Sequence, residues 1–558
     1  MDTSSSYTLD VITRQDTNNT SICFGCLCNI SNSSLLIINS IDDLIGTIVY
    51  NKIRNIYIQD FSYVASYIYY YIISNNIKYN TSAKFNFAGR IAYTAFSSEG
   101  GAMYYIKLFF KNDINFCCEI KSSRNKSMSL LRDLQTSFNI DIDYNIIDDD
   151  NTLQLSSSDV LTDDIMENTC ARSVALAHVM KKLLSSGNTK LTIGSDAMRQ
   201  WQKLDGMHFP SMPRIDDDLD AKFRLAYRGG FTWLNPNFKD KVLGHGFVMD
   251  VNSLYPYVMR YFALPCGVPH HTYEVPHNKL YIAHVIIYNA TLKQGGIPCI
   301  SNMNRCDGTK GSIISNEYLD TVGNMEAWFT NFDLDLILLN YDVNIQPVEY
   351  YYFDKIEGCF NNFIDTNYEI KRTSSGARRQ IAKLNLDSLY GRFGIKIGRH
   401  KTVPVINEDG ILKFIPGDVL KDDTIRYLPM AIFITSIARY LVIRSALEII
   451  DRVVYIDTDG IHIVGDDIPD VFDISSDLGA WKVEAEFNKA KYIGLKTYIH
   501  DEVDGTTIVK MSGAPEEVRN NINWDNFQTG TVVPGKIMMH SIPGGYVRYK
   551  TKYKIYGC

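Results

Sequence analysis

Apolar and polar positions follow two different periods along the chain, which predicts a mixture of strands and helices. Residues 1–190 combine short β-rich runs with helical stretches, and residues 262–355 are irregular and interrupted by Pro and Gly. Residues 360–391 are predicted as a helical hairpin, and helix and strand patterns alternate over residues 427–500. The length of 558 residues is enough for several domains. We therefore expect a multi-domain α+β protein.

An apolar run ends in a carboxylate within residues 246–256, Gly-Phe-Val-Met-Asp-Val-Asn-Ser-Leu-Tyr-Pro. This order predicts a strand that ends at Asp250 and a helix capped by Asn252 or Ser253, with the proline in its first turn. The free amides of residues 252–255 would then suit a polyanion. Taken alone, the pattern equally describes an ordinary capped strand-to-helix turn.

Two β-branched runs between Val453 and Ile463 flank an Asp-Gly pair, which is a strong signal for a β-hairpin. Asp457 and Asp459 lie two residues apart, so a strand would place both on the same side. Such like charges repel each other unless a divalent cation lies between them. An Asp-Gly pair by itself could mark only a turn, and Asp457 is what makes a functional role the better interpretation.

The net charge is −7, from 56 basic and 63 acidic residues, but it is unevenly spread. Residues 371–401 contain nine basic residues and one acid, so this segment carries +8 and the rest of the chain −15. A cationic stripe that ends in an aromatic ring suits a triphosphate and a base, whereas the alternative is a solvated basic face. The stripe consists of Arg379, Lys383, Asp387 and Tyr390. The side of the same helix expected to face the core consists of Ala377, Ile381, Leu384 and Ser388.

Eleven cysteines are too few for a disulfide scaffold. Cys23, Cys26 and Cys28 raise the alternative of a zinc site, with Cys117 and Cys118 as further ligands. We favour a buried strand instead, because no second Cys-x-x-Cys or His pair completes the pattern.

The N-terminal residues are polar and lack the layout of a secretory signal. The longest apolar run, near Tyr63–Ile73, is far shorter than the roughly 20 residues of a membrane helix. We therefore expect a soluble intracellular protein with no membrane partner.

The ordered motifs resemble those of family B DNA polymerases. Residues 248–256 resemble the first palm motif, residues 383–391 the fingers motif, and residues 455–460 the Tyr-x-Asp-Thr-Asp motif. Lys496-Thr497-Tyr498 is similar to the downstream Lys-x-Tyr motif. Residues 227–235, Tyr-Arg-Gly-Gly-Phe-Thr-Trp-Leu-Asn, are similar to the template-binding linker of protein-primed members, the phi-twenty-nine type of small linear-genome phages.

The resemblance implies an α+β right-hand fold, with an N-terminal RNase-H-like domain of the exonuclease type. The implied segments are an exonuclease-like domain at 1–190, a first palm part at 191–261, a first insertion that contacts the terminal protein at 262–356, fingers at 357–394, a second insertion for strand displacement and processivity at 395–427, a second palm part at 428–530, and a thumb at 531–558.

The resemblance also implies a DNA-directed DNA polymerase, a nucleotidyltransferase that uses two Mg²⁺ ions, with Mn²⁺ as a substitute. Asp250, Asp457 and Asp459 would be catalytic, and Asp250, Val251 and Asp459 would hold the metal. The nucleotide-binding residues would be Val251, Asn252, Ser253, Leu254, Tyr255, Lys371, Arg379, Lys383, Asp387 and Tyr390. The DNA-binding residues would be Tyr227, Arg228, Gly229, Gly230, Gly391, Lys496, Thr497 and Tyr498.

In detail, the resemblance implies that Lys371 and Lys383 neutralise the β and γ phosphates. Tyr255 would lie under the sugar and exclude a 2′-hydroxyl, while Tyr390 would pack on the nascent base pair. Lys496, with the nearby tyrosine of its motif, would hold the primer end.

The implied partners are primer–template DNA, dNTPs and a terminal protein whose hydroxyl is the first primer, with a single-stranded-DNA-binding protein as a further partner. We expect a monomer, encoded by a virus or linear element, in the cytoplasm of a host cell. The alternatives are a plasmid or priming polymerase of the same family, or a catalytically inactive scaffold that binds DNA or the terminal protein. Retention of all three palm aspartates disfavours the scaffold, because unused clustered acids destabilise a fold.

The N-terminal segment departs from the family's exonuclease motifs. Asp10 is kept, but Ile12 replaces the glutamate of the first motif. The second motif aligns from Asp60 to Val64, which replaces an aspartate, and Arg172 replaces the acid of the third. One surviving acid cannot hold two divalent ions, so we expect a domain that keeps its fold and lacks proofreading.

Two polymerase positions also differ from the family. Gly460 stands where Ser is usual, and we expect a tight turn there that accepts glycine at positive φ. Asp387 stands where Asn is usual, one helical turn from Lys383, and a pair at that spacing contributes only about 0.2–0.5 kcal/mol. We expect slower catalysis or altered nucleotide affinity, but not inactivity. The acidic run at residues 141–150 is expected to lie away from the DNA path.

Overall fold

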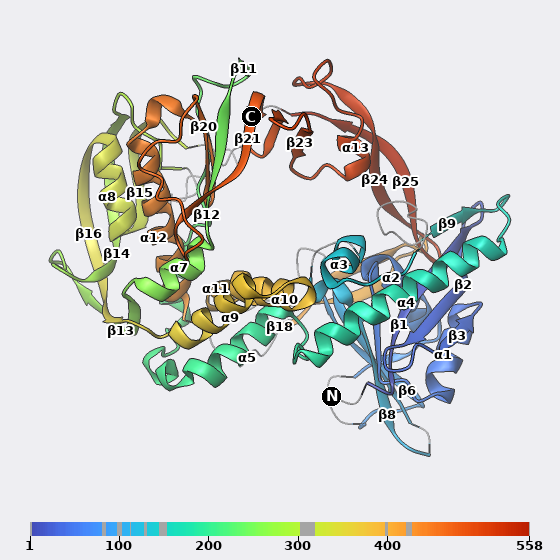
Figure 1. Ribbon diagram of the computed structural model, residues 1–558. Coiled ribbons are helices and arrows are strands. Elements are labelled where there is room, and N and C mark those ends of the chain that lie inside the picture. Colours follow the sequence, from blue (N-terminus) through green and yellow to red (C-terminus); the bar gives the residue numbers. More distant parts are fainter. Residues whose placement is uncertain are drawn as a thin grey trace.

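The computed structural model describes residues 3–80, 85–97, 103–111, 113–127, 131–143, 153–301, 318–396, 400–419 and 427–556. Most of the predicted acidic run, residues 144–150, lies outside the described residues, and so does Arg399 of the basic segment. Figure 1 shows two lobes, joined below by helices α5, α9, α10 and α11 and above by the β24–β25 ribbon.

The N-terminal lobe is built on a nine-stranded sheet with the order β3-β2-β1-β4-β8-β7-β6-β5, in which β9 pairs with β1. Its strands are β1 (Ser6–Gln15), β2 (Thr20–Asn29), β3 (Leu35–Ile38), β4 (Asn55–Ile58), β5 (Lys78–Tyr79), β6 (Ile91–Ser97), β7 (Met103–Phe110), β8 (Phe116–Ser122) and β9 (Leu153–Ser156). Its helices are α1 (Ile41–Tyr50), α2 (Phe61–Ser74), α3 (Leu131–Phe138) and α4 (Asp163–Ser185), with a 3₁₀ turn at Ser123–Asn125.

The predicted buried strand of cysteines is confirmed, because Cys23, Cys26 and Cys28 all lie on β2. The side chains of Cys26 and Cys28 are fully buried. Within the described ranges, no group of three or more His, Cys, Asp or Glu side chains is arranged to hold a metal ion.

The second lobe is built on an eight-stranded sheet with the order β10-β19-β20-β12-β21-β22-β23, in which β11 pairs with β21. Its strands are β10 (Thr232–Leu234), β11 (Val242–Leu243), β12 (Gly246–Val251), β19 (Val453–Asp457), β20 (Gly460–Val464), β21 (Trp481–Gly494), β22 (Thr497–Glu502) and β23 (Thr507–Met511). Its helices are α6 (Asp217–Arg224), α7 (Leu254–Tyr261), α12 (Leu428–Leu447) and α13 (Glu516–Arg519), with a 3₁₀ turn at Ile450–Arg452.

Helix α12 is the apolar centre of this lobe and packs in its largest hydrophobic core. By length and composition it is the one described helix that could cross a membrane, yet 72% of its most apolar window is buried inside the protein. Burial of this kind is typical of a core helix. The expectation that Tyr63–Ile73 is the longest apolar stretch was therefore wrong, because α12 tolerates a few polar residues inside a longer apolar helix.

A four-stranded antiparallel sheet, order β13-β16-β14-β15, stands beside the second lobe. It consists of β13 (Leu264–Thr272), β14 (Leu280–Leu292), β15 (Thr321–Thr330) and β16 (Tyr341–Ile356), with α8 (Asn331–Asn340) between the last two. Two separate hairpins are formed by β17 (His400–Ile406) with β18 (Leu412–Val419), and by β24 (Val532–Ile542) with β25 (Gly545–Lys554). These sheets follow the order of the predicted segments, and the exact domain boundaries stay predictions.

The predicted helical hairpin is confirmed. It consists of α9 (Asn361–Thr373), α10 (Gly376–Ser388) and the short α11 (Tyr390–Phe393), which pack on α5 (Ile193–Asp205). A 3₁₀ turn at Gly206–Ser211 extends α5.

The buried face of α10 was predicted only in part. Ile381 is buried as expected, but the other buried positions are Ala382, Asn385 and Leu386. Leu384 and Ser388 are only half-buried, because α10 packs on two sides, against α9 and against α5.

Candidate active site

Asp250 and Asp459 are brought together by the pairing of β12 with the β19–β20 hairpin. Asp250 is the fifth residue of β12 and lies opposite Gly460 in the antiparallel register. The N–H of Val251 donates to the carbonyl of Asp459 across 2.9 Å. The predicted meeting of two carboxylates from distant segments is therefore present in the fold.

The turn of this hairpin lies one residue earlier than predicted. Asp457 pairs with Gly460, so Thr458 and Asp459 form the two-residue loop, and Gly460 is already in β20. Positive φ belongs to Thr458 (63°), whereas Gly460 does not adopt it. The expectation that Gly460 serves a positive-φ turn was wrong. The Thr458 N–H donates to the Phe231 carbonyl at 2.7 Å, which holds the loop in this conformation.

The three aspartates have different neighbours. Asp250 forms an ion pair with Lys482 at 2.5 Å, and Asp457 forms one with Lys496 at 2.5 Å. Burial, together with repulsion from Asp250, raises the pKa of Asp459 to about 7. Asp457 is thus turned toward a lysine, and among the described residues the three acids do not form a three-carboxylate metal cluster.

This donor set fits a divalent cation. A nearby second carboxylate raises the pKa of a carboxyl group. A cation that lies between the two groups stabilises the charged form again. Mg²⁺ prefers one or two protein carboxylates and completes its shell with water and substrate phosphates. Asp250 and Asp459 supply those two carboxylates, and Lys482 provides the positive charge beside Asp250.

The strand-to-helix turn after β12 differs from the predicted cap. Ser253 occupies the cap position of α7 with a left-handed φ of 58°, but its hydroxyl does not cap the helix. It accepts a hydrogen bond from the Lys371 ammonium at 2.7 Å. The backbone N–H of Asn252 is not free either, because it donates to the Ala480 carbonyl at 2.9 Å. The anion-binding amides predicted here are therefore limited to residues 253–255.

The fingers helices place cations and rings beside this turn. Burial lowers the pKa of Lys371, although Asp387 counteracts the effect. Desolvation raises the pKa of Asp387 against the pull of Lys383 and Lys371. The rings of Tyr255 and Tyr390 lie 4.4 Å apart between centroids. The structure thus brings these predicted nucleotide-binding residues to one place.

Other predicted nucleotide and DNA contacts are positioned less directly. Arg379 on α10 donates to the Lys371 carbonyl at 3.0 Å. Leu254 is buried, so only its backbone could face a ligand. Gly391 lies on α11 with open space where a side chain would start. The Thr497 hydroxyl turns back to the Leu495 carbonyl at 3.1 Å.

The Lys496 and Tyr498 pair lies directly beside the hairpin. The Lys496 amide donates to the Tyr455 hydroxyl at 2.8 Å, and φ of Lys496 is 51°. Tyr498 packs against the rings of Tyr455, His462 and Tyr492, at centroid distances of 5.1–5.8 Å. Both residues are thereby fixed next to Asp457.

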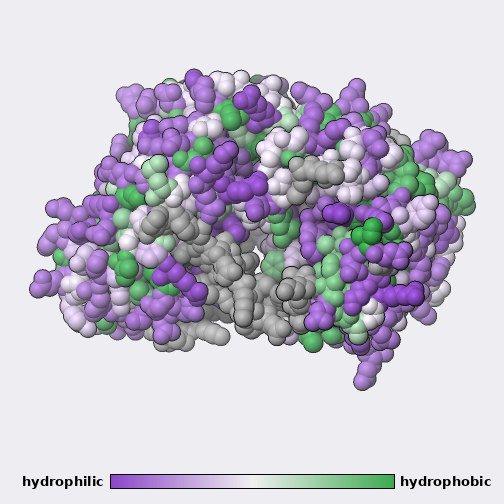
Figure 2. Space-filling view, turned by 90° about the horizontal axis from the view of Figure 1, so that it is seen from below, coloured by the Kyte–Doolittle hydropathy of each residue, from purple (hydrophilic) through white to green (hydrophobic). Residues whose placement is uncertain are grey.

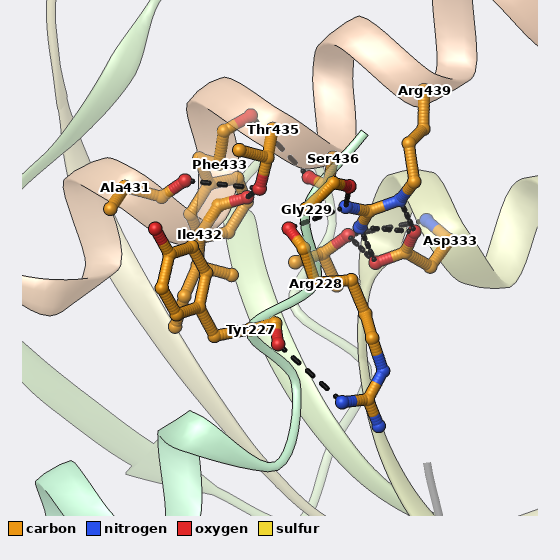
Figure 3. A network of polar contacts seen from close by, with 11 residues as sticks. Tyr227, Arg228, Gly229, Asp333, Ala431, Ile432, Phe433, Thr435, Ser436 and Arg439 are labelled. Carbon is orange, nitrogen blue, oxygen red and sulfur yellow. Dashed lines mark hydrogen bonds and ion pairs between the residues drawn. The ribbon is translucent and has the colours of Figure 1, made fainter. Parts of the chain in front are cut away.

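Arg439 of α12 holds the predicted linker, although the sequence did not identify it. Figure 3 shows its guanidinium donating to the carbonyls of Arg228 and Gly229, both at 2.9 Å. The same group forms a two-pronged ion pair with Asp333 of α8 at 2.8 and 3.0 Å. Burial and the nearby Arg439 lower the pKa of Arg228 to about 10. An arginine inside an otherwise apolar helix was the one available signal.

The linker then reaches the catalytic hairpin. A side chain at Gly230 would start 2.5 Å from the methyl group of Thr458, so only glycine allows this approach. Tyr227 lies close to Gly394 at the end of α11, where an added side chain would start 2.6 Å from the Tyr227 hydroxyl oxygen and 2.8 Å from its ring. The predicted linker therefore connects the fingers with the hairpin.

A family model described as "DNA polymerase type B, organellar and viral" matches residues 46–475. The DNA polymerase of Bacillus phage phi29 is 37% identical over 402 residues, which cover 67% of this chain and 68% of that protein. This chain belongs to the family B DNA polymerases. The DNA polymerase of Streptococcus phage Cp-1 is 36% identical over 384 residues, 66% of this chain and 67% of that protein.

The fold of the polymerase agrees with these relatives. The structure of phi29 DNA polymerase complexed with primer–template DNA matches it with a TM-score of 0.88 and 29% identity, over 99% of both chains. The predicted α+β right-hand fold is therefore confirmed, and the polymerase is a DNA-directed DNA polymerase. Membership of this family implies a divalent metal cofactor in general terms.

The segments predicted to correspond to the exonuclease motifs lie in the N-terminal lobe of the polymerase. Asp10 forms an ion pair with Arg172 at 3.1 Å, and the two side chains are 13% and 5% exposed. Asp60 forms an ion pair with Arg548 of β25. Asp10, the acid expected to survive, and Asp60 are therefore each paired with an arginine. Figure 2 shows a hollow between the two lobes. The described surface of the two lobes on this face is mostly hydrophilic.

Proposed function

We propose that the polymerase replicates a linear viral genome inside a host cell, by protein-primed and template-directed nucleotidyl transfer with two Mg²⁺ ions, and that it lacks 3′→5′ proofreading. Primer–template DNA and dNTPs are its substrates. Structures of phi29 DNA polymerase with primer–template DNA and with incoming nucleotides support these partners. The observation that carries the proposal is the closeness of Asp250 and Asp459 at the palm hairpin, where burial and repulsion from Asp250 raise the pKa of Asp459.

The surrounding residues have separate roles in this reaction. Asp250 and Asp459 would hold Mg²⁺, which would supply the positive charge needed to activate the primer hydroxyl and to stabilise the α-phosphate. Lys371 carries the charge for the triphosphate, and the Ser253 hydroxyl fixes its position. The adjoining rings of Tyr255 and Tyr390 provide a wall for the sugar and the nascent base pair.

Primer extension on a defined template tests the central claim. We expect Mg²⁺-dependent extension by the wild type and its loss in Asp459→Asn, a change that keeps the size of the side chain. The matched control is Asp466→Asn, because Asp466 is almost fully exposed and lies at the far end of the hairpin. No extension by the wild type would instead favour a catalytically inactive scaffold.

The ion pairs of the N-terminal lobe support loss of proofreading. Arg172 neutralises Asp10 and occupies the position of a family acid, so the charge that would attract a divalent ion is already balanced. We expect no Mg²⁺-dependent degradation of single-stranded DNA from its 3′ end. Degradation that Asp10→Ala abolishes would contradict this proposal.

Protein priming is proposed from the sequence motifs of the linker and from the inserted sheet β13–β16. The test is transfer of a labelled dNMP to a candidate terminal protein from the same genome, with no DNA primer present. We expect the label to be covalently bound to that protein and to require Asp459. Efficient extension of DNA primers without any such transfer would limit the enzyme to a repair or plasmid-type role.

A further inference from the structure

The β24–β25 ribbon ends on the N-terminal lobe (Figure 1), where Arg548 contacts Asp60. The guanidinium of Arg548 forms an ion pair with Asp60, and these side chains are 10% and 15% exposed. It also lies 4.0 Å from the centroid of the Tyr63 ring. Burial lowers the pKa of Arg548 to about 10, although the nearby Asp10 counteracts the effect. The ribbon thus places a cation beside Asp60 and near Asp10, the one acid expected to survive from the exonuclease motifs.

The backbone of the ribbon is bound to the same lobe. The Tyr546 amide donates to the Ser66 hydroxyl at 3.1 Å, and its carbonyl accepts a hydrogen bond from Tyr67 at 2.8 Å. The Arg548 amide donates to the Gln154 side chain at 2.8 Å. These groups point out of the hairpin, so the lobe satisfies amides that would otherwise face water.

The tip of the second hairpin, β17–β18, joins this contact. The Tyr70 hydroxyl of α2 lies 2.8 Å from the Ile542 carbonyl in the ribbon and also contacts the Gly410 carbonyl. It accepts a hydrogen bond from the Leu412 amide at 3.0 Å. One buried tyrosine therefore links the N-terminal lobe to both hairpins.

We propose that the exonuclease-like domain is the docking site of the ribbon, with Asp60 and Arg548 as its latch, and that this latch sets how long the polymerase stays on DNA. The ribbon closes the upper connection between the lobes, and the fingers close the lower one (Figure 1). Duplex held between them leaves by sliding off an end or after the latch opens. This inference rests on the proposed polymerase function.

Hydrogen exchange of the ribbon tests the latch without requiring activity. The variants are Arg548→Leu and Asp60→Leu, each of which removes one partner of a mostly buried ion pair. The control is Glu119→Gln, which breaks ion pairs with Lys107 and Lys121 in the same lobe, away from the ribbon. We expect exchange at the Tyr546 amide to rise at least about tenfold in both latch variants and to stay unchanged in the control.

The double variant makes the test specific to the pair. If both side chains act through one contact, Asp60→Leu with Arg548→Leu should raise exchange no more than either single change. Additive effects, or unchanged exchange in both single variants, would overturn the latch. Global unfolding is recognised because the amides of β12 would then exchange faster as well.

The functional part is tested by the length of DNA made in one binding event, with excess trap DNA. We expect products at least about threefold shorter for both latch variants, and single-nucleotide incorporation within about twofold of the wild type. Faster exchange with unchanged product length would overturn the link between latch and residence time. A wild type that extends no primer would refute the proposed function, while hydrogen exchange would still decide whether the latch exists.

Discussion

The ammonium group of Lys371 donates a hydrogen bond to the Ser253 hydroxyl across 2.7 Å, which joins the fingers helix α9 to the strand-to-helix turn after Asp250. Ser253 has a left-handed φ of 58°, so its position costs backbone strain that a glycine would not incur. The Ser253 side chain, one of the two expected to cap α7, holds the Lys371 ammonium instead.

Removal of Lys371 should weaken nucleotide binding. A hydrogen-bonded cation on a phosphate contributes enough that Lys371→Ala is expected to raise the KM for dNTP by about tenfold or more. Ser253→Ala and Ser253→Gly both delete the hydroxyl and should raise KM by the same smaller factor. Only the glycine relieves the strain, so it alone should raise the Tm. Different KM values for the two serine variants would show that backbone strain, not the hydroxyl, positions Lys371.

Asp387 should restrain nucleotide affinity. Its carboxylate interacts with both Lys371 and Lys383, and these interactions compete with the triphosphate for the lysines. Asp387→Asn is expected to lower the KM for dNTP by about twofold to threefold, which corresponds to a pair interaction of a few tenths of a kcal/mol. Glu369→Gln is the control, because Glu369 pairs with Arg372 on the same hairpin. An unchanged KM in steady-state incorporation would contradict the prediction.

The buried pair of Arg439 and Asp333 should fix the linker. Arg439→Met leaves the Asp333 charge in a mostly buried site, and the expected loss is about 3–5 kcal/mol of unfolding free energy. Adding Asp333→Leu should recover most of that stability, because no unpaired charge remains. The carbonyls of Arg228 and Gly229 still lack their donor, so primer–template affinity should stay reduced in the double variant. Urea unfolding and DNA binding measure the two effects separately.

Much of the catalytic centre follows from local sequence patterns. A strand that ends in Asp250, a hairpin that presents Asp459, and a helical hairpin with Lys371 and Lys383 all depend on periodicity and turn chemistry within a few residues. The order of these motifs along the chain is in turn specific enough to indicate the family. Once β12 pairs with β20 in one sheet, Asp250 and Asp459 come together.

What the sequence could not predict depends on partners that are distant along the chain. Lys482 beside Asp250, and Arg548 on Asp60, are single cations with no local pattern that ties them to a carboxylate. The turn at Thr458 was misplaced because the Phe231 carbonyl and the register with Asp250 outweigh the local preference of Asp-Gly. Tertiary contacts thus override propensity at functional positions.

Gly460 should accept the serine that is usual in the family. A side chain there would start 3.4 Å from the Met249 carbonyl and 3.9 Å from a carboxylate oxygen of Asp250, which are ordinary contacts. Gly460→Ser is expected to change the unfolding free energy by less than about 0.5 kcal/mol and to keep primer extension. Gly246→Ala is the contrasting control, because its new carbon would lie 2.1 Å from the Ile463 carbonyl and overpack the sheet. Comparable losses in both variants would show that the hairpin cannot tolerate any side chain at the first residue of β20.

His462 should make the palm sensitive to acid. It is buried on β20, three residues after Asp459, and shares a hydrogen bond of 2.8 Å with the Tyr492 hydroxyl. Burial lowers its pKa to about 3. The unfolded chain binds a proton near pH 6.5, whereas the folded chain does not until about pH 3, so protonation favours unfolding between these values. The contribution of His462 to the unfolding free energy is fully present above pH 6.5. Below that pH it falls by up to about 1.4 kcal/mol per pH unit.

His462→Gln keeps a polar partner for Tyr492 and removes the titrating group. Its unfolding free energy is measured in urea from pH 7 to pH 4.5. We expect it to decline less steeply than that of the wild type, and the difference in slope should correspond to the uptake of about one proton fewer on unfolding. His540→Gln is the control, because His540 is exposed on the ribbon and its removal should leave the slope unchanged. An equal slope for the wild type and His462→Gln would mean that His462 is protonated within the fold, and that the palm core admits more water than its burial indicates.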